Sequence, residues 1–108
     1  MRMWNVDPAL LCRQHLLGEH VEMHMFEGCC RRGKSLAGYI GKGLVELGNI
    51  NNRHDELVTE MERRGYNHKS PLAAIRAKPE GRVDIAQNIA DLCARCPDCR
   101  ERVRRAAI

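Results

Sequence analysis

Three cysteines near the end of the chain have the spacing of a metal site. Cys93, Cys96 and Cys99 follow one another at intervals of three residues in the run CARCPDC. Paired C-x2-C steps are typical of zinc, which prefers four nitrogen or sulfur ligands in tetrahedral geometry. A fourth ligand would have to come from Cys29, Cys30, a histidine or a second subunit. An iron–sulfur cluster and plain reduced thiols are the alternatives that this incomplete pattern leaves open.

Two histidines form a second candidate site. His20 and His24 are four residues apart, so a helix would bring both rings to one face. This is the spacing of a helical metal pair, although the chain has no HExxH motif. Histidines on the helix surface, without a ligand, are the more common explanation of such a pair.

The helix that must position these residues is predicted from Asp7 to Gly28. Asp7 is a good N-cap and Pro8 suits the first helical turn. Apolar residues follow two stripes, with polar side chains between them. We therefore expect a central helix packed between neighbours, with its buried polar groups paired or part of a site. The stripes are Leu10, Leu17, Val21 and Met25 on one side, and Cys12, Leu16 and Met23 on the other.

Two further helices are predicted in the middle of the chain. Ser35 can cap a short helix that ends near Gly41. Apolar residues at helical spacing from Ile50 onward predict a longer helix, with Gly65 as its natural terminator. The arginines of this longer helix are expected on or near its solvent side; they are Arg53, Arg63 and Arg64.

The C-terminal part is predicted to be irregular at first and then helical. Residues 66–82 contain two prolines and a glycine and are expected to wrap the surface. Asp84 can cap a helix, and Pro97 starts a final one. No strand signal occurs. The predicted fold is an all-α, single-domain helical bundle of residues 1–108 around the N-terminal helix, with a cysteine-containing segment at 84–108.

Composition narrows the class of protein. A chain of 108 residues suits one domain, and an aromatic content of 4% means that its core is aliphatic. The net charge of +4 suits an anionic partner. No apolar run approaches membrane-spanning length, and the first residues do not read as a signal peptide. We expect a cytoplasmic protein whose six cysteines are free, metal-bound or redox-active rather than paired in disulfides.

Several motifs occur in one order along about two-thirds of the chain. They are the triplet Gln14-His15-Leu16, the acids Glu19 and Glu22, the basic turn that ends at Gly33-Lys34, and the run ELVTEMERRGYN. In this order they resemble the pyrimidine-dimer DNA glycosylase family, the phage endonuclease V type that cuts ultraviolet-damaged DNA. The resemblance implies a compact helical enzyme, bacterial or from a phage, that acts on double-stranded damaged DNA as both glycosylase and AP lyase. It implies no catalytic cofactor, and we expect a monomer.

The resemblance also implies which residues act. The family's nucleophile is the N-terminal α-amine, and the register from Glu22 brings Met1 to that position. Met1 is expected to stay, because bacterial methionine removal generally needs a small second residue. Glu22 would stabilise the positive charge that develops at the sugar and would transfer protons. The expected DNA-contacting residues are Arg2, Gln14, His15, Glu19, Arg31, Arg32, Lys34 and Arg64.

Two features of the chain differ from the family pattern. Val21 and Met25 stand where the phage enzyme has arginines that contact DNA. The cysteine segment replaces an aromatic, lysine-bearing tail. Both differences concern recognition of the lesion more than the lyase chemistry.

An N-terminal amine suits this chemistry because α-amines are less basic than lysine side chains, so a larger fraction is neutral and nucleophilic near pH 7. Attack on C1′ expels the base and gives an imine, and loss of a C2′ proton then releases the 3′ phosphate. Two functions of other classes remain as alternatives. One is a non-catalytic DNA-binding module whose cysteines hold zinc, and the other is a metal-dependent nuclease that uses His20 and His24.

Overall fold

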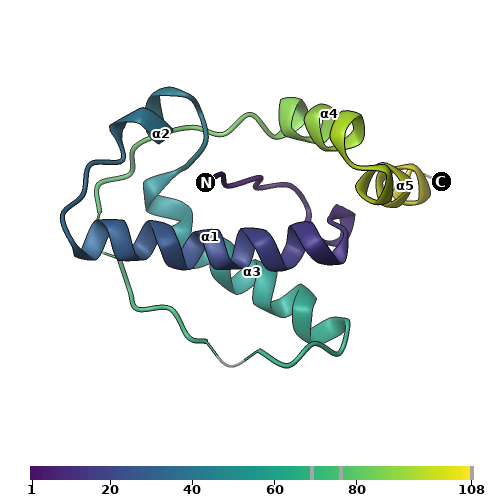
Figure 1. Ribbon diagram of the computed structural model, residues 1–108, viewed down its shortest axis with the longest axis horizontal. Coiled ribbons are helices and arrows are strands. Elements are labelled where there is room, and N and C mark those ends of the chain that lie inside the picture. Colours follow the sequence, from purple (N-terminus) through teal and green to yellow (C-terminus); the bar gives the residue numbers. More distant parts are fainter. Residues whose placement is uncertain (69, 76, 108) are drawn as a thin grey trace.

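Helices form the regular structure of this protein. The computed structural model describes residues 1–68, 70–75 and 77–107, and these contain no strand, so the predicted all-α fold is confirmed (Figure 1). No helix among the described residues is both long and apolar enough to cross a bilayer. The elements are η1 (Pro8–Leu10), α1 (Arg13–Arg31), α2 (Ala37–Gly41), η2 (Leu47–Asn49), α3 (Ile50–Arg63), α4 (Ile85–Arg95) and α5 (Pro97–Ala106), where η denotes a 3-10 helix.

The packing of α1 across α3 forms the centre of the fold (Figure 1). Leu16 and Met23 of α1 and Leu57 of α3 are fully buried, as one of the two predicted stripes requires. The other stripe is not covered in the same way, because Val21 and Met25 are 54% and 49% exposed. The prediction that α1 is buried on two sides is therefore wrong for this stripe: α3 covers only one face of the helix.

The start of α1 also differs from the prediction. Asp7 caps the short helix η1 instead, and its Oδ1 accepts a hydrogen bond from the Ala9 amide at 3.0 Å. Cys12 is extended, with ψ of 168°, and separates η1 from α1. The Cys12 amide donates to Sγ of Cys99 at 3.2 Å. This contact with α5 satisfies a donor that a continuous helix would have directed along its own axis.

The other predicted elements are confirmed. Helix α2 forms, but its N-cap is Leu36 and not Ser35, whose hydroxyl accepts from the Ala37 amide at 3.2 Å one residue before the cap. Gly65 follows α3 with φ of 83°, a conformation that favours glycine. Asp84 caps α4, and Pro97 is the first residue of α5. The described residues between 66 and 82 contain no helix or strand.

Arg53 is fully buried, although a position near solvent was predicted. Its guanidinium donates two hydrogen bonds to the Glu19 carboxylate, at 2.6 and 2.9 Å, and a third to the Val6 carbonyl at 2.6 Å. Arg53 shares the buried face of α3 with Ile50 and Leu57, and Glu19 supplies the charge that makes its burial tolerable. The ion pair joins α1, α3 and the N-terminal segment.

The Arg64 side chain is also buried, contrary to the prediction, whereas the Arg63 side chain is exposed as predicted. The Arg64 side chain is 7% exposed, and its guanidinium donates to the carbonyls of Pro8 and Leu11 at 3.1 and 2.7 Å. It also pairs with Glu60 at 2.7 Å. Hydrogen bonds from Arg63 and Arg64 lower the pKa of Glu60 to about 2. These bonds hold the chain around η1 against the end of α3.

The N-terminal segment lies between α1 and α4 (Figure 1). The Met3 amide donates to the Leu44 carbonyl at 2.7 Å, and the Asn88 side chain donates to the Trp4 carbonyl at 2.7 Å. Both Met3 and Trp4 are buried. Helices α4 and α5 form a corner at one end of the molecule, where α5 packs on η1 (Figure 1). The N-terminal segment is therefore packed into the fold and does not extend freely into solvent.

We expect the substitution Arg53→Met to lower the free energy of unfolding by about 3–5 kcal/mol, because it leaves the Glu19 carboxylate buried without its partner. Arg63→Met on the same helix is the control, since its side chain is 62% exposed and should change stability little. Urea unfolding followed by circular dichroism measures both. Equal stability of the two variants would contradict a structural role for the Glu19–Arg53 pair.

Candidate active site and metal centre

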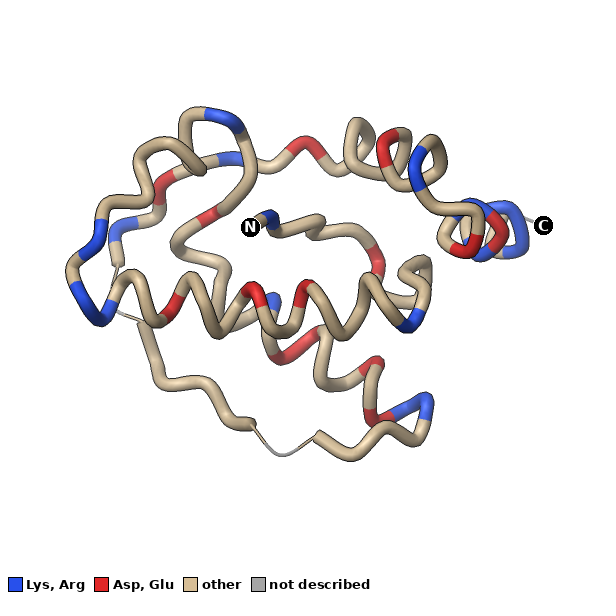
Figure 2. Tube along the Cα trace, viewed as in Figure 1, with Lys and Arg blue, Asp and Glu red and all other residues tan. Residues whose placement is uncertain are grey.

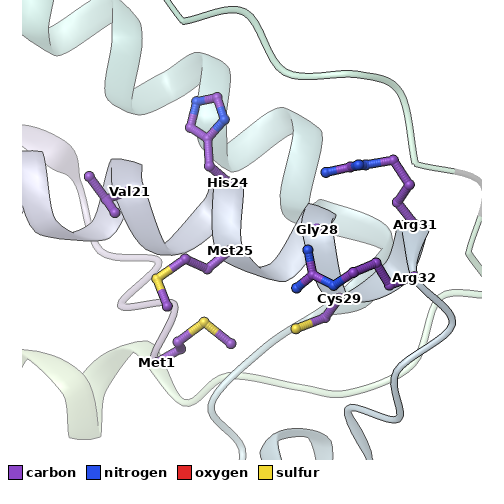
Figure 3. A pocket seen from close by; sticks show the side chains of 8 residues that line it. All are labelled: Met1, Val21, His24, Met25, Gly28, Cys29, Arg31 and Arg32. Atoms are coloured by element: carbon purple, nitrogen blue, oxygen red, sulfur yellow. The ribbon is translucent and has the colours of Figure 1, made fainter.

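The start of the chain meets α1 at Glu22. The Arg2 amide donates to Oε2 of Glu22 at 3.0 Å, so the α-amine of Met1 is one residue from this contact. The Met1 side chain extends along α1 and, with Val21 and Met25, lines an open cavity of about 330 Å³ (Figure 3). We call this cavity the Met1 pocket. A chain terminus and a half-buried carboxylate are thus neighbours on the surface of α1.

Glu22 also lines a second cavity, of about 290 Å³, which we call the Glu22 pocket. Gly18 stands one helical turn before Glu22, and no atom lies within 4 Å of the place where its Cβ would be. The wall of the pocket is therefore bare backbone at this point. The residues that line the Glu22 pocket are Trp4, Gln14, His15, Gly18, Glu19 and Glu22.

Beside the pocket, Arg2 and His15 both pack against the ring of Trp4. The Arg2 guanidinium lies 4.0 Å from the centre of the Trp4 ring, and His15 meets the same ring edge-on at 5.9 Å. Arg2 is also bound to α4, where it pairs with Asp91 at 2.7 Å. Its hydrogen bond lowers the pKa of the Asp91 carboxyl. Arg2 therefore fixes the N-terminal segment and α4 to each other.

Glu19 forms the floor of the Glu22 pocket. It is 1% exposed, and both of its oxygens accept hydrogen bonds from Arg53. Burial raises the pKa of the Glu19 carboxyl, and the bonds from Arg53 and from the Asn5 amide act against that rise. Two acids one turn apart on α1 therefore have different surroundings, since Glu19 is buried and paired while Glu22 is half-buried beside the chain terminus.

The basic turn after α1 is exposed, and Figure 2 shows its positive charge at one end of the helix. Arg31 and Arg32 line the Met1 pocket, and Lys34 follows on the surface. Arg31 also pairs with Glu27 at 3.1 Å, an exposed contact that DNA phosphate could replace at small cost. The turn supplies positive charge at the rim of the Met1 pocket.

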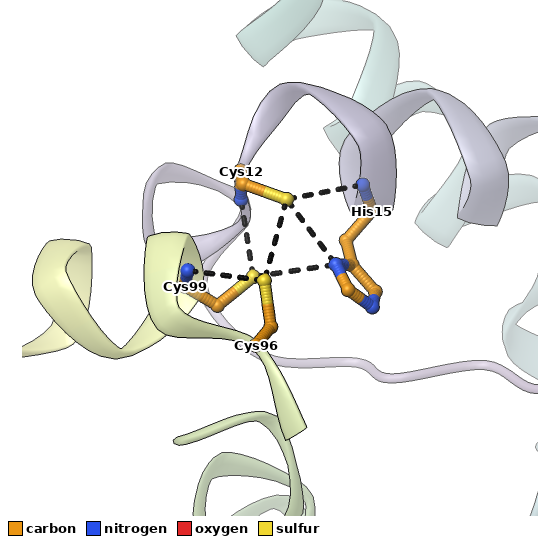
Figure 4. Close-up of side chains that lie close together, drawn as sticks. All are labelled: Cys12, His15, Cys96 and Cys99. Carbon is orange, nitrogen blue, oxygen red and sulfur yellow. Dashed lines mark hydrogen bonds between the residues drawn. The ribbon is translucent and has the colours of Figure 1, made fainter. Parts of the chain in front are cut away.

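Four metal-ligating side chains converge where α1 and α5 begin (Figure 4). They form what we call the cysteine–histidine cluster: Cys12, His15, Cys96 and Cys99. Cys12 and Cys96 are the N-caps of their helices, and each sulfur accepts the amide three residues further on, at 3.4 Å in both cases. Each helix start therefore supplies two potential ligands three residues apart: a C-x2-H pair at α1 and a C-x2-C pair at α5.

The distances within the cysteine–histidine cluster match a tetrahedral zinc site. Ligand bonds of about 2.3 Å to sulfur and 2.0 Å to nitrogen give tetrahedral edges of about 3.8 Å between sulfurs and about 3.5 Å between sulfur and nitrogen. The sulfurs of Cys12 and Cys96 are 3.8 Å apart. Nδ1 of His15 is 3.2 Å from the Cys12 sulfur and 3.5 Å from the Cys99 sulfur. These three distances fit zinc, and all four ligand atoms lie within 4.8 Å of one another.

The two C-terminal thiols of the cluster differ in acidity. Burial raises the pKa of the Cys99 thiol to about 12. Burial also opposes ionisation of Cys96, but hydrogen bonds from the Cys99 amide and from neighbouring thiols lower its pKa. Cys96 stands at the N-terminus of α5, a position that stabilises negative charge, whereas the buried Cys99 would need a bound cation to be stable as a thiolate.

The family model for pyrimidine dimer DNA glycosylase matches residues 1–74, which is well over half of the chain. The chain belongs to the pyrimidine dimer DNA glycosylase family. The resemblance expected from the sequence is thereby confirmed, and membership implies DNA as the substrate. The match spans the N-terminal segment and α1 to α3, and it ends before α4 and α5. No significant similarity was found to curated proteins or to solved structures.

In this family member the predicted DNA-contacting residues fall into two groups. Four of them are exposed: Gln14 lines the Glu22 pocket, Arg31 and Arg32 line the Met1 pocket, and Lys34 lies in the basic turn that follows α1. His15 is half-buried in the wall of the Glu22 pocket. Arg2, Glu19 and Arg64 instead have their polar atoms bonded inside the protein. Contact of any of them with DNA stays a prediction, and the contacts of the last three show structural roles.

The predicted metal ligands are brought together only in part. Cys96 and Cys99 meet in the cysteine–histidine cluster, whereas Cys93 lies outside it, in the last turn of α4. Its place is taken by Cys12, which the hydrophobic pattern had assigned to an apolar stripe. The overlooked signal was the spacing of Cys12 and His15, which repeats the three-residue step of Cys96 and Cys99.

We expect Gly18→Leu to slow cleavage of lesion-containing DNA, because the added side chain would fill the Glu22 pocket. Gly18→Ala is the matched control. It should raise the free energy of unfolding by up to about 1 kcal/mol, since alanine favours the helix and meets no atom within 4 Å. Strand cleavage assays and urea unfolding measure the two effects. Equal cleavage rates for the leucine and alanine variants would show that substrate does not enter this pocket.

Proposed function

We propose that this member of the family is both a DNA glycosylase and an AP lyase, with the α-amine of Met1 as its nucleophile. The observation that carries the proposal is the 3.0 Å hydrogen bond from the Arg2 amide to the Glu22 carboxylate. This bond keeps the first residue beside an acid that faces the Glu22 pocket. The substrate is double-stranded DNA with a pyrimidine dimer or a related damaged base.

The reaction proceeds in two stages. The neutral amine attacks C1′ of the deoxyribose, the bond from C1′ to the base breaks, and the base leaves with the electron pair and takes up a proton. The sugar ring opens as the amine loses its protons, which gives an imine. Removal of a proton from C2′ then drives cleavage of the bond from C3′ to the phosphate oxygen. Water hydrolyses the remaining imine and frees the amine.

Glu22 supplies the acid–base chemistry in this scheme. Its carboxylate stabilises the positive charge that develops at the sugar and exchanges protons with the amine and with C2′. The hydrogen bond from the Arg2 amide holds the carboxylate in place for this work. Arg31, Arg32 and Lys34 position the DNA through its phosphates, which fixes the backbone without reading the sequence. Damaged nucleotides are stacked more weakly, which favours their extrusion toward the pocket.

Borohydride trapping on abasic DNA separates this proposal from the alternatives. Reduction of the imine leaves a covalent protein–DNA product, which only an imine-forming enzyme gives. A DNA-binding module without catalysis would shift DNA in a gel but give no covalent product. A metal-dependent nuclease would cleave DNA without trapping and would stop when a chelator is added.

We expect Glu22→Gln to retain DNA binding and helical content but to lower strand cleavage by about 10²–10⁴-fold, because the acid–base group is lost. Glu62→Gln, at an exposed position of α3, is the control and should cleave normally. A second arm adds a few residues before Met1, which displaces the α-amine and should abolish trapping. Full cleavage by Glu22→Gln, or undiminished trapping by the extended protein, would contradict the mechanism.

We also propose that the cysteine–histidine cluster binds one structural zinc ion. The support is the match between its distances and a tetrahedral site, together with a complete set of four ligands. Zinc there would join the N-terminus of α1 to the corner between α4 and α5. Because His15 also lines the Glu22 pocket, the ion would hold one pocket wall in position.

Removal of one ligand tests this zinc site. We expect Cys96→Ser to lose about one zinc ion per chain and to lower the melting temperature, because the ion's binding free energy contributes to folding. Cys93→Ser, three residues earlier, is the matched control and should keep the zinc. Elemental analysis of protein purified without chelator gives the metal content. Equal zinc in both variants and the parent would contradict the assignment.

A further inference from the structure

The other four histidines of the chain meet at the interface of α1 and α3. We call this group the histidine cluster: His20 and His24 of α1, His54 of α3, and His68 beyond α3. One ring nitrogen from each lies within 4.8 Å of the others. The surface location that the sequence suggested for the first two is wrong for His20, which is 8% exposed, and His54 is 3% exposed. His24 is half-buried, and in Figure 3 its ring points away from Met1.

The hydrogen bonding of the histidine cluster is incomplete without a further partner. A neutral imidazole has one N–H, yet the two nitrogens of His54 face two acceptors, the Asp55 carboxylate at 3.0 Å and the Ser70 carbonyl at 3.2 Å. Nε2 of His24 is buried with no hydrogen-bond partner in the part of the chain that the structure describes. Buried nitrogens without partners are costly, so the arrangement lacks a group that accepts nitrogen lone pairs.

A divalent cation accepts lone pairs from neutral imidazoles, which are the nitrogen ligands that zinc prefers. The contact from His54 Nδ1 to Asp55 is the second bond that metal-binding histidines usually make. The nitrogen that would bind the metal is then Nε2, which would exchange its contact with the Ser70 carbonyl for the ion.

We infer that the histidine cluster is a second zinc site, separate from the cysteine–histidine cluster. A tetrahedral all-nitrogen site has edges of about 3.3 Å. Nε2 of His20 and Nε2 of His68 are already 3.0 Å apart. All four ligand nitrogens lie within 4.8 Å of one another, so binding requires the wider pairs to move closer by at most about 1.5 Å. Four protein ligands leave no open coordination position, so the ion has a structural role and is not a nuclease centre.

The site ties together three segments that are far apart in the sequence. His20 and His24 are one turn apart on α1, and His54 faces them from α3. Gly65, with its positive φ, reverses the chain after α3 so that His68 returns to the same place. Zinc bound here would hold the start of the irregular segment after α3 against the helical pair. The inference does not depend on the DNA chemistry.

Zinc content of the untagged, full-length protein tests the inference. The protein is equilibrated with zinc, freed of unbound metal by gel filtration, and analysed for metal. We expect about two zinc ions per chain for the parent and a loss of about one in His68→Asn and in His24→Asn. Asn67→Ala, an exposed neighbour of His68, is the control and should retain both ions. Circular dichroism checks that each variant is folded.

Cobalt in place of zinc assigns each ion to its cluster. His68→Asn should keep the thiolate-to-cobalt charge-transfer band and lose part of the visible d–d absorption. Cys96→Ser should weaken the charge-transfer band and keep the absorption of an all-nitrogen site. Parental zinc content in both histidine variants would overturn the inference, as would complete loss of zinc in Cys96→Ser. Both of these results concern zinc content and not borohydride trapping. Failure of the zinc inference can therefore be told apart from failure of the proposed enzyme mechanism.

Discussion

The buried ion pair between Glu19 and Arg53 is the interaction on which the rest of this structure depends. Both side chains are inaccessible to solvent, so neither charge is stable there without the other. The pair fixes α1 against α3, and its remaining bonds extend to the Val6 carbonyl and the Asn5 amide. The N-terminal segment is therefore attached to the helical centre through the same two side chains. This attachment directs the first residues along α1 toward Glu22.

The catalytic proposal depends on this arrangement, because an α-amine is useful only if the chain end is held still. Three contacts do this around Arg2: its amide bonds to Glu22, its guanidinium pairs with Asp91, and the same group stacks on Trp4. Holding a nucleophile in the reactive geometry removes a large part of the activation barrier. The apolar Val21 and Met25 leave the Met1 pocket less charged than the family pattern, and the positive charge comes from the turn after α1.

The two clusters proposed to bind metal lie in different parts of a small domain. The cysteine–histidine cluster lies between α1 and the α4–α5 corner, outside the central helical pair, and two of its ligands come from beyond the family match. The histidine cluster lies within the central pair, and all its members fall inside the matched residues. A domain with few aromatic residues has a limited apolar core. Metal ions proposed at both places would add cross-links to this limited core.

The sequence by itself determined the all-α fold, the cap of α4, the end of α3, the start of α5 and the family. Asp84, Pro97 and Gly65 act through local backbone geometry, so their positions predict helix ends without any knowledge of packing. Family motifs likewise need only order and spacing along the chain. The tertiary structure decided which polar residues are buried. Arg53 was expected near solvent and Glu19 at a position that contacts DNA, because a helix pattern does not reveal the charge on the facing helix.

The two clusters proposed to bind metal also could not be predicted in full from the sequence. Cys96 and Cys99 could be recognised from their spacing, but their partners Cys12 and His15 are more than 80 residues away in the chain. Only the packing of α5 on η1 brings the two pairs together. His20 and His24 likewise gave a visible pair, whereas His54 and His68 join them only through the crossing of α1 with α3 and the turn at Gly65. Local geometry follows from neighbouring residues, but a site shared between distant segments exists only once the helices have packed.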